Sequence, residues 1–351
     1  MATPFPRSLK AMIWLIAVLA IVYSAYWFAG SRVVLWGART GLAQLVAEGR
    51  AQPSQISLQG FPSRFDVTAQ PVAVSSTSGW LEWQAPRADV FALSYRPTHL
   101  IAVLPSEQRL RLGQLWTDLR MAEARASVNL GLSRDLPLEQ AIFVAKAGQI
   151  RAENLPETLT GAAPGEPITG FDEARAAIRA LDAGGLRQEL GLELKGLDLP
   201  PAAVKRLGDL PKRLDRLHAD VTFTLDRPLD RQALVALPRP EAVQITDLSL
   251  GWGPATVAAS GSLTVSPEGL LDGELNMSAT KWDDILDLAV ASRLLDRDIA
   301  KTYRRALDAL ADLTGTQDGA LKVPLTIRQG FMSLGPLPLG YAPVLPPASA
   351  F

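Results

Sequence analysis

The hydrophobic pattern of the chain begins with an uncharged run. No Asp, Glu, Lys or Arg occurs between Lys10 and Arg32, and the intervening residues are mostly Ala, Ile, Leu, Val and aromatics. About twenty such residues, each rising about 1.5 Å in a helix, cross a hydrocarbon core of about 30 Å. Aromatic residues stand near both ends, as they do at membrane interfaces. We therefore predict a transmembrane anchor in residues 1–31, with the candidate membrane residues Ala11, Trp14, Tyr23, Tyr26, Trp27 and Gly30.

The flanking charges predict how the anchor is oriented. Arg7, Lys10 and the amino terminus precede the run, and Arg32 and Arg39 follow it. This slight asymmetry favours a cytoplasmic N terminus, with the rest of the chain on the other side of the membrane. A cleaved signal peptide is the main alternative. Signal peptides usually have a shorter apolar core of about 7–15 residues that ends in small residues, whereas this run ends in Tyr-Trp-Phe.

After the anchor, the apolar period changes from helical to alternating. Leu35, Ala38, Leu42 and Leu45 keep helical spacing, which predicts a helical extension over 32–52. From residue 56 onward, apolar and polar residues alternate in short runs separated by turn residues, the pattern of an antiparallel sheet. The predicted strands are 56–58, 65–69, 81–83, 88–95, 100–104, 109–112, 122–132, 141–147, 192–199, 219–225, 243–252, Leu321–Arg328 and Phe331–Leu334, together with a hairpin over 257–279.

Two segments carry the clearest alternation, one within 122–132 and one in the hairpin. Their apolar side chains fall on one face, and polar side chains fall on the other. If helices cover only part of that apolar face, it forms a groove suited to an acyl chain or a protein partner. A closed sandwich without a ligand is an equally good interpretation of the pattern. The candidate groove residues are Ala124, Ala126, Val128, Leu263, Val265, Leu275 and Met277.

Helices are predicted at intervals along the sheet. Asp172 can cap a helix over 173–181, and further helices are expected over 201–217, 229–237, 282–290 and 298–313. A Pro- and Gly-rich loop over 153–170 separates a β-rich N-terminal half, 53–152, from a β-rich C-terminal half, 171–340. A Pro-rich tail follows over 341–351. The fold class is therefore mainly β (α+β): a membrane helix followed by an extended, curved antiparallel sheet with a few packed helices.

Composition and motifs do not favour catalysis. The chain has no Cys, and its two histidines, His99 and His218, lie far apart in the sequence. Phosphate-binding, zinc-protease and serine-hydrolase motifs do not occur in it. Asp283 and Asp284 stand where a helix begins, a position that favours acidic residues electrostatically. We expect no catalytic residue, no metal site and no cofactor.

Charge also argues against nucleic acid. The formal net charge is −1, whereas nucleic-acid-binding domains usually present a basic face. The basic residues from Lys205 to Arg216 form a local cluster that Asp209 and Asp215 dilute. A solvated helix face explains this cluster, and contact with anionic lipid is the alternative. His218, at the end of this predicted helix, is expected to be structural.

Four sequence patterns stand out along the chain after the apolar run. They are Gly60-Phe-Pro-Ser-Arg-Phe65, Tyr95-Arg-Pro-Thr-His-Leu-Ile101, Gly261-Ser-Leu-Thr-Val265 with Gly269-Leu-Leu-Asp-Gly-Glu-Leu275, and Val323-Pro-Leu-Thr-Ile327 with Gly330-Phe-Met-Ser-Leu-Gly-Pro-Leu-Pro-Leu339. Together they resemble a bacterial family known as domain of unknown function 2125. The hairpin and the C-terminal glycine pattern are also similar to AsmA-type envelope proteins, whose β-sheet grooves are associated with outer-membrane biogenesis and, in larger members, with lipid transfer. The resemblance implies a bacterial envelope protein and brings no catalytic residues.

These observations together predict a non-enzymatic protein of the bacterial inner membrane. A single-pass anchor holds it, its bulk is periplasmic, and its β-sheet groove binds lipid acyl chains or an envelope protein in cell-envelope homeostasis. The alternatives are a scaffolding protein with a closed sandwich and, less favoured, an envelope hydrolase. No nucleic-acid partner is expected.

Overall fold

The computed structural model describes residues 7–153, 162, 166–234, 236–314 and 319–344. Its helices are α1 (Arg7–Ala47), α3 (Pro201–Leu207), α4 (Trp282–Ala291) and α5 (Arg297–Thr314), with a 3-10 turn at Arg231–Leu234. Its strands are β1 (Gln55–Gln59), β2 (Arg64–Gln70), β3 (Val72–Ser75), β4 (Leu81–Ala85), β5 (Ala88–Leu93), β6 (Arg96–Val103), β7 (Glu107–Leu112), β8 (Leu115–Leu130), β9 (Leu138–Ala152), β10 (Thr169–Ala180), β11 (Arg187–Asp198), β12 (Arg213–Leu225), β13 (Pro240–Trp252), β14 (Ala255–Val265), β15 (Leu271–Thr280), β16 (Leu321–Arg328), β17 (Phe331–Leu334) and β18 (Leu337–Tyr341).

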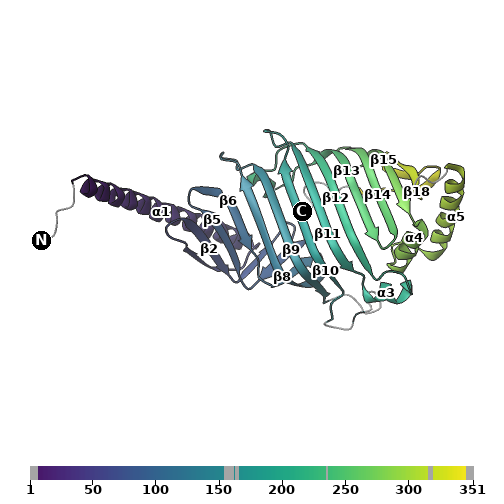
Figure 1. Ribbon diagram of the computed structural model, residues 1–351, viewed down its shortest axis with the longest axis horizontal. Coiled ribbons are helices and arrows are strands. Elements are labelled where there is room, and N and C mark those ends of the chain that lie inside the picture. Colours follow the sequence, from purple (N-terminus) through teal and green to yellow (C-terminus); the bar gives the residue numbers. More distant parts are fainter. Residues whose placement is uncertain (1–6, 154–161, 163–165, 235, 315–318, 345–351) are drawn as a thin grey trace.

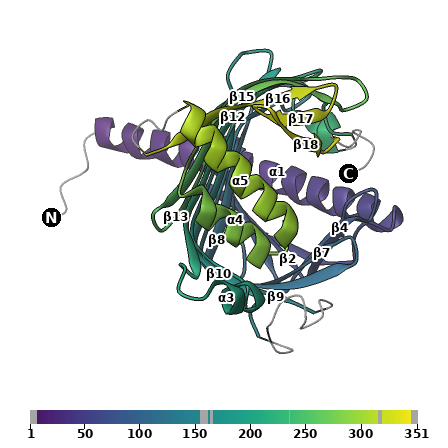
Figure 2. The same ribbon diagram turned by 90° about the vertical axis from the view of Figure 1, so that its right-hand side faces the viewer.

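The described strands form one 18-stranded antiparallel sheet that branches at β8. The first part of β8 pairs with β7, which leads to β4 and β3, and its second part pairs with β6, which leads to β5, β2 and β1. From β9 to β18, each strand pairs with the next along the chain. Seen end-on, the sheet curls around its long axis (Figure 2). The predicted fold class, mainly β with a curved antiparallel sheet, is confirmed.

Helix α1 is continuous, and it projects from one end of the sheet (Figure 1). Its first part is exposed on every side, with Trp14 73% exposed, whereas Trp27 is buried. The second part runs along the sheet and contacts β1 and β2. Gly49 has a φ of +70°, and the amide of Arg50 donates to the carbonyl of Leu45 just beyond the helix end. The predicted helical extension beyond the anchor is therefore present.

Three predictions from helical spacing are wrong. Residues 173–181 lie in β10 rather than in a helix, so Asp172 caps nothing and pairs instead with Arg213. The helix predicted over 201–217 ends at Leu207, and the rest of that segment enters β12. Among the described residues of 229–237, the only helical element is the short 3-10 turn. The helices at Trp282–Ala291 and Arg297–Thr314 are as predicted, whereas the strands β3 and β18 were not predicted.

A crease across the sheet explains two of these errors. The paired register skips Ala147 of β9 and Gly196 of β11, which have φ values of +49° and +59°. Where β8, β10 and β12 cross the same line, the register skips Ala122, Asp172 and Asp215, and the apolar side chains on either side stand three residues apart while packing in one cluster. Such spacing imitates a helix. The pairs concerned are Met121 and Ala124, Phe171 and Ala174, and Leu214 and Leu217, each packed within one cluster.

Two glycines hold the hairpin of β14 and β15 tightly together. Gly261 faces Leu275 and Gly273 faces Leu263, so each glycine lies opposite a leucine. Their φ values are +152° and +151°, and a Cβ on Gly261 would overlap the carbonyl oxygen of Glu274. Both positions therefore require the backbone that only glycine adopts easily.

We expect Gly261→Ala to lower the free energy of unfolding by about 1–3 kcal/mol, because the new Cβ must strain the backbone. Gly191→Ala is the matched control: Gly191 lies within β11, has no atom within 4 Å of its missing Cβ and lacks a positive φ. That control should be neutral or stabilising by about 0.4–1 kcal/mol. Urea unfolding in mild detergent measures both changes, and equal effects at the two glycines would contradict the tight pairing.

Candidate functional site

The most extended feature of the sheet is a row of directly paired apolar residues. Each member is the register partner of the next, and the row crosses thirteen strands without a polar or charged residue. At about 4.8 Å per strand it is about 58 Å long, nearly twice the thickness of a bilayer core. From β1 to β16 its members are Leu58, Val67, Val90, Ala102, Ala126, Phe143, Ala176, Leu192, Ala219, Leu248, Ala259, Met277 and Val323.

Two further rows of apolar residues run parallel to this row and widen it into a band. Because alternate residues of a strand share a face, residues two positions away continue the apolar surface. One further row runs through Phe65, Ala92, Leu100, Val128, Ala141, Ile178, Leu190, Val221, Ile245, Gly261, Leu275, Leu325 and Leu334. The other runs through Ala124, Ala145, Ala174, Leu194, Leu217, Leu250, Val257, Ala279 and Leu321. We call these three rows together the apolar band.

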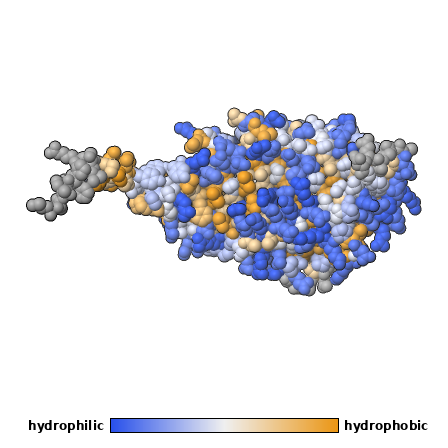
Figure 3. Space-filling model, in the orientation of Figure 1, coloured by the Kyte–Doolittle hydropathy of each residue, from blue (hydrophilic) through white to orange (hydrophobic). Residues whose placement is uncertain are grey.

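The opposite face of the same strands carries charges that pair with one another. Glu123, Lys146, Glu173, Lys195 and Arg216 are register partners in that order, so the sign of the charge alternates across β8, β9, β10 and β11. The Lys146 ammonium lies 3.0 Å from Glu123, and the Arg216 guanidinium lies 2.9 Å from Glu193 on the neighbouring row. Hydrophilic residues accordingly spread over the side of the sheet seen in Figure 3. The faces thus differ in chemistry, although Ile101, Val103 and Ile142 stand exposed on the charged face and hydrophobic residues are visible there in Figure 3.

The apolar band is covered at its ends more than at its centre. Helices α3 and α4 pack on Trp252 and Leu214, and a second cluster around β13 to β16 includes Ala342. The main helix contacts of the sheet are those of α1 with β1 and β2 and of α4 with β14. Helices α4 and α5 lie across the end of the sheet nearest the viewer in Figure 2. Between these regions, Leu192 and Leu248 belong to the band and remain 41% and 45% exposed.

The seven predicted groove residues lie in or beside the apolar band. Ala124, Ala126 and Val128 are on β8, and Leu263, Val265, Leu275 and Met277 are on β14 and β15. Five of them are members of the three rows; Leu263, two residues beyond Gly261 on β14, pairs with Val243 and Gly273, and Val265 faces Leu271 at the margin. The two groups are separated along the sheet by β9 to β13, so they share a face rather than a pocket. Whether this face holds a ligand stays a prediction.

The residues in between were missed. Phe143, Ala176, Leu192 and Ala219 join the two predicted groups into one band. The signal was present in β10, where Ala174, Ala176 and Ile178 alternate with charged or small residues. The short helix predicted there concealed it, because Ala, Arg and Leu also favour helices.

The junction of α1 with the sheet is built from aromatic residues. The Trp27 indole nitrogen donates to the carbonyl of Arg64 at 2.8 Å, and the Tyr26 hydroxyl donates to the carbonyl of Ser94 at 2.7 Å. The Tyr23 hydroxyl lies 3.0 Å from the Ser94 hydroxyl. The Trp27 ring packs against Phe65, which is the first member of the second apolar row. The helix is therefore fixed to the end of the apolar band.

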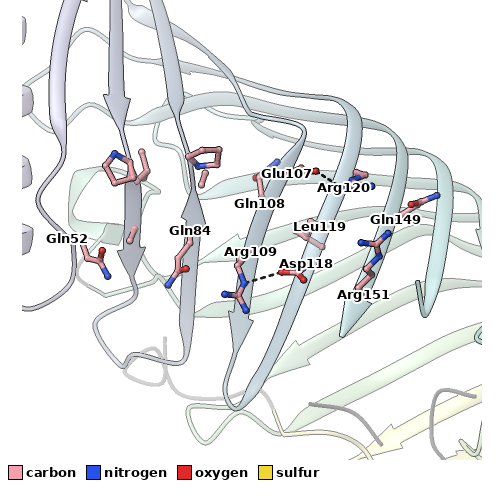
Figure 4. A pocket seen from close by; sticks show the side chains of 15 residues that line it. Gln52, Gln84, Glu107, Gln108, Arg109, Asp118, Leu119, Arg120, Gln149 and Arg151 are labelled. Atoms are coloured by element: carbon pink, nitrogen blue, oxygen red, sulfur yellow. Dashed lines mark hydrogen bonds and ion pairs between the residues drawn. The ribbon is translucent and has the colours of Figure 1, made fainter. Parts of the chain in front are cut away.

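A hollow of about 540 Å³ lies near β3, β4, β7, β8 and β9 (Figure 4). Gln84, Arg109, Asp118 and Arg151 are successive register partners along it, on the charged face. Arg109 pairs with Asp118 at 3.0 Å and with Glu153 at 2.5 Å, so its charge is neutralised within the protein. Leu119, which packs in the cluster of Met121, also lines the hollow. The hollow therefore combines charged and apolar walls.

The two histidines do not form a catalytic arrangement. His99 is on β6, and His218 is in β12 rather than at the end of a helix. The His218 Nε2 atom lies 3.7 Å from Asp247, and Ser249 donates to the same carboxylate at 3.4 Å. The carboxylate, not the imidazole, stands between the other two groups, whereas a hydrolytic triad needs the histidine in the middle. No group of three or more His, Cys, Asp or Glu able to hold a metal was found within the described part of the chain.

The remaining charged candidates have structural partners. Asp283 and Asp284 are in the first turn of α4, and Arg304 of α5 pairs with Asp283 at 2.7 Å. The basic cluster is split between α3 and β12. Within it, Arg206 donates to the carbonyl of Ala291, and Arg216 pairs with Glu193.

The ion pair between Glu82 and Arg111 lies beside the hollow and depends on pH, so it offers a test of the charged face. Glu82 accepts a hydrogen bond from Gln84, which lowers its pKa; burial opposes this, and Arg111, 2.7 Å away, lowers the pKa further. A carboxyl with a lowered pKa in the folded state stabilises the fold above its unfolded pKa and loses that contribution as the pH falls through the folded value. We expect Glu82→Gln to lower the free energy of unfolding at pH 7 by about 0.5–1 kcal/mol.

The difference between Glu82→Gln and wild type should shrink below about pH 4, where carboxylates protonate. Urea unfolding at pH 7 and at low pH measures it. Glu241→Gln, at an exposed position on β13, serves as the control and should leave stability nearly unchanged at both pH values. A Glu82 effect that does not depend on pH would show that the ion pair contributes nothing.

Comparison with known proteins bears on the family of the chain. Residues 27–343 match the family DUF2125, described as an uncharacterized protein conserved in bacteria. Neither the curated proteins nor the solved structures give a significant match. The match covers α1 from Trp27 onward and the sheet as far as β18, which is most of the chain. The chain therefore belongs to the DUF2125 family of bacterial proteins.

Proposed function

We propose that this protein is a non-enzymatic, membrane-anchored periplasmic protein that holds lipid acyl chains on the apolar band of its sheet. The observation that carries the proposal is the row from Leu58 to Val323. This row crosses thirteen paired strands, and none of its thirteen members has a polar side chain. Large contiguous apolar surfaces on soluble domains mark binding sites for lipid, membrane or protein. Holding lipid would place the protein in cell-envelope homeostasis.

The chemistry of the band favours an acyl chain over a polar ligand. Small-molecule sites usually combine apolar walls with a few convergent polar groups that orient the ligand. The three rows contain only apolar residues and one glycine, so they offer no hydrogen bond to a head group. An acyl chain needs none, because removing its methylenes from water contributes about 0.8 kcal/mol each. The partly exposed centre at Leu192 and Leu248 is where such a chain would lie.

The anchor supports the same proposal. Residues Met12–Ala47 form a helix with a mean hydropathy of 2.0 in its most apolar part, long and apolar enough to cross a membrane. An anchored sheet stays beside the bilayer that supplies acyl chains. The flanking charges favour a cytoplasmic N terminus, which would put the sheet in the periplasm of the bacterial inner membrane.

A closed sandwich without a ligand is the competing proposal. The clusters around Trp252 and around Ile245 show that parts of the band are indeed packed against other elements. A closed sandwich requires, however, that the centre of the band be covered as well, and Leu192 and Leu248 stay exposed there. An envelope protein that supplies the missing cover would be a partner in place of lipid.

We expect Leu192→Asp to abolish most of the phospholipid that co-purifies with the full chain, because a carboxylate in an apolar site is costly. Ile142→Asp is the matched control. The exposed fraction of Ile142, 36%, is similar to the 41% of Leu192. Ile142, however, pairs with Ser127 on the charged face. Native mass spectrometry after gentle extraction measures bound lipid in the three proteins. Absence of co-purifying lipid in the wild type, or equal loss in both variants, would contradict lipid binding by the band.

A further inference from the structure

The junction between α1 and the sheet lies within the uncharged run of the helix. Charged residues first appear on either side of the run at Lys10 and Arg32. The residues that hold the sheet are Tyr23, Tyr26 and Trp27, which all precede Arg32. Gly30 also belongs to the junction, since its missing Cβ would lie 3.0 Å from the Phe65 ring. The sheet is therefore attached inside the membrane segment rather than beyond it.

The length of the run decides the depth of this junction. If the hydrocarbon core ended before Tyr23, residues 11–22 would supply only about 18 Å of helix. A bilayer core is about 30 Å thick, and extending the span in the other direction would draw Lys10 and Arg7 into it. The full run from Ala11 to Ser31 matches the core. Residues 23–31, about 12 Å of helix, then lie in the leaflet on the side of the sheet, together with the loops bonded to them.

The loops bonded to residues 23–31 expose aromatic residues and lack acidic ones, as a position inside the leaflet requires. Phe61 in the β1–β2 turn and Tyr95 in the β5–β6 turn are 52% and 65% exposed, and Phe28 of α1, stacked on Phe61, is 56% exposed. Neither 59–65 nor 93–97 contains Asp or Glu. Arg64 and Arg96 stand at the same turns; the Arg64 guanidinium pairs with Asp66 at 2.8 Å, and an arginine such as Arg96 can keep its stem in apolar surroundings while its guanidinium reaches the head groups.

Several backbone groups of these turns are paired within the protein. The carbonyls of Arg64 and Ser94 accept hydrogen bonds from Trp27 and Tyr26. The amide of Ser94 donates to the carbonyl of Ser63, and the amide of Arg64 donates to that of Gly60. Within hydrocarbon, each unpaired backbone group costs several kcal/mol, so irregular backbone is tolerated there only when it is paired or protein-covered. The aromatic bonds of α1 supply that pairing.

We infer that the β1–β2 and β5–β6 turns, with Phe61 and Tyr95 at their tips, insert into the bilayer beside the anchor. The occupant of this apolar patch is the acyl region of the leaflet on the side of the sheet. The inference rests on the anchor of the proposed function, and it adds a route by which lipid reaches the band. Phe65 contacts Trp27 and opens the second apolar row. Phe65 itself is buried beneath α1, so an acyl chain would reach the band beside the junction rather than at Phe65.

The chain lacks cysteine, so single-cysteine variants of the full protein report one position each. We would attach an environment-sensitive fluorophore at Tyr95→Cys and Phe61→Cys and reconstitute the variants in nanodiscs of phosphatidylethanolamine and phosphatidylglycerol. A fraction of the lipid would carry a nitroxide at a shallow or a deep acyl position. Leu294→Cys is the control, because Leu294 is 82% exposed and follows α4 at the end of the sheet remote from α1 (Figure 1).

Insertion predicts a blue-shifted emission at positions 61 and 95, with strong quenching by the shallow nitroxide, and neither effect at position 294. Because Phe61 packs on Trp27, Tyr95, whose side chain is the more exposed, keeps the test valid if Phe61→Cys disturbs the junction. Quenching at 95 no greater than at 294 would overturn the inference. Loss of co-purifying lipid with quenching intact would instead contradict lipid holding and leave insertion standing.

Discussion

The register of the antiparallel ladder is the constraint on which the rest of this structure depends. In a paired sheet, a slip of one residue moves every side chain of a strand to the other face. Thirteen strands nevertheless keep one row apolar from Leu58 to Val323. The charged face reinforces the same register, because Glu123, Lys146, Glu173 and Lys195 alternate in sign across neighbouring strands. Both faces thus specify one alignment of the strands.

Irregular positions shape the sheet without breaking that register. Ala147 and Gly196 reverse the pleat at the crease, yet the strands pair with unchanged register on both sides of it. Gly196 is needed there because a Cβ would overlap the Asp172 carboxylate. The shift between Ile245 and Leu248 in β13 has a similar consequence, since both residues remain on the apolar side. Bulges and left-handed residues re-aim side chains in this way.

The sequence was sufficient to predict the long apolar N-terminal helix, the sheet, most strands and the α4–α5 hairpin, because each has a strong local pattern. It was insufficient for β10 and β12. Leu214 and Leu217 stand three residues apart only because the crease lies between them, and a pleat reversal has no local signature at that position. The seven predicted groove residues fall in or beside the band, but the continuity through Phe143 and Leu192 depends on register between distant strands. The attachment of Tyr26 and Trp27 to the sheet is likewise a long-range contact.

The central claim is that the centre of the apolar band is an open face. Nitroxides placed singly along β11 from Glu189 to Leu194, in the nanodisc-bound protein, test this most directly through their collision rates with oxygen and with a water-soluble nickel complex. The account predicts an alternation of period two. Positions 190, 192 and 194 should collide with oxygen and be shielded from nickel, whereas 189, 191 and 193 should collide with nickel. Positions 190, 192 and 194 inaccessible to both reagents would show a closed core and contradict the account.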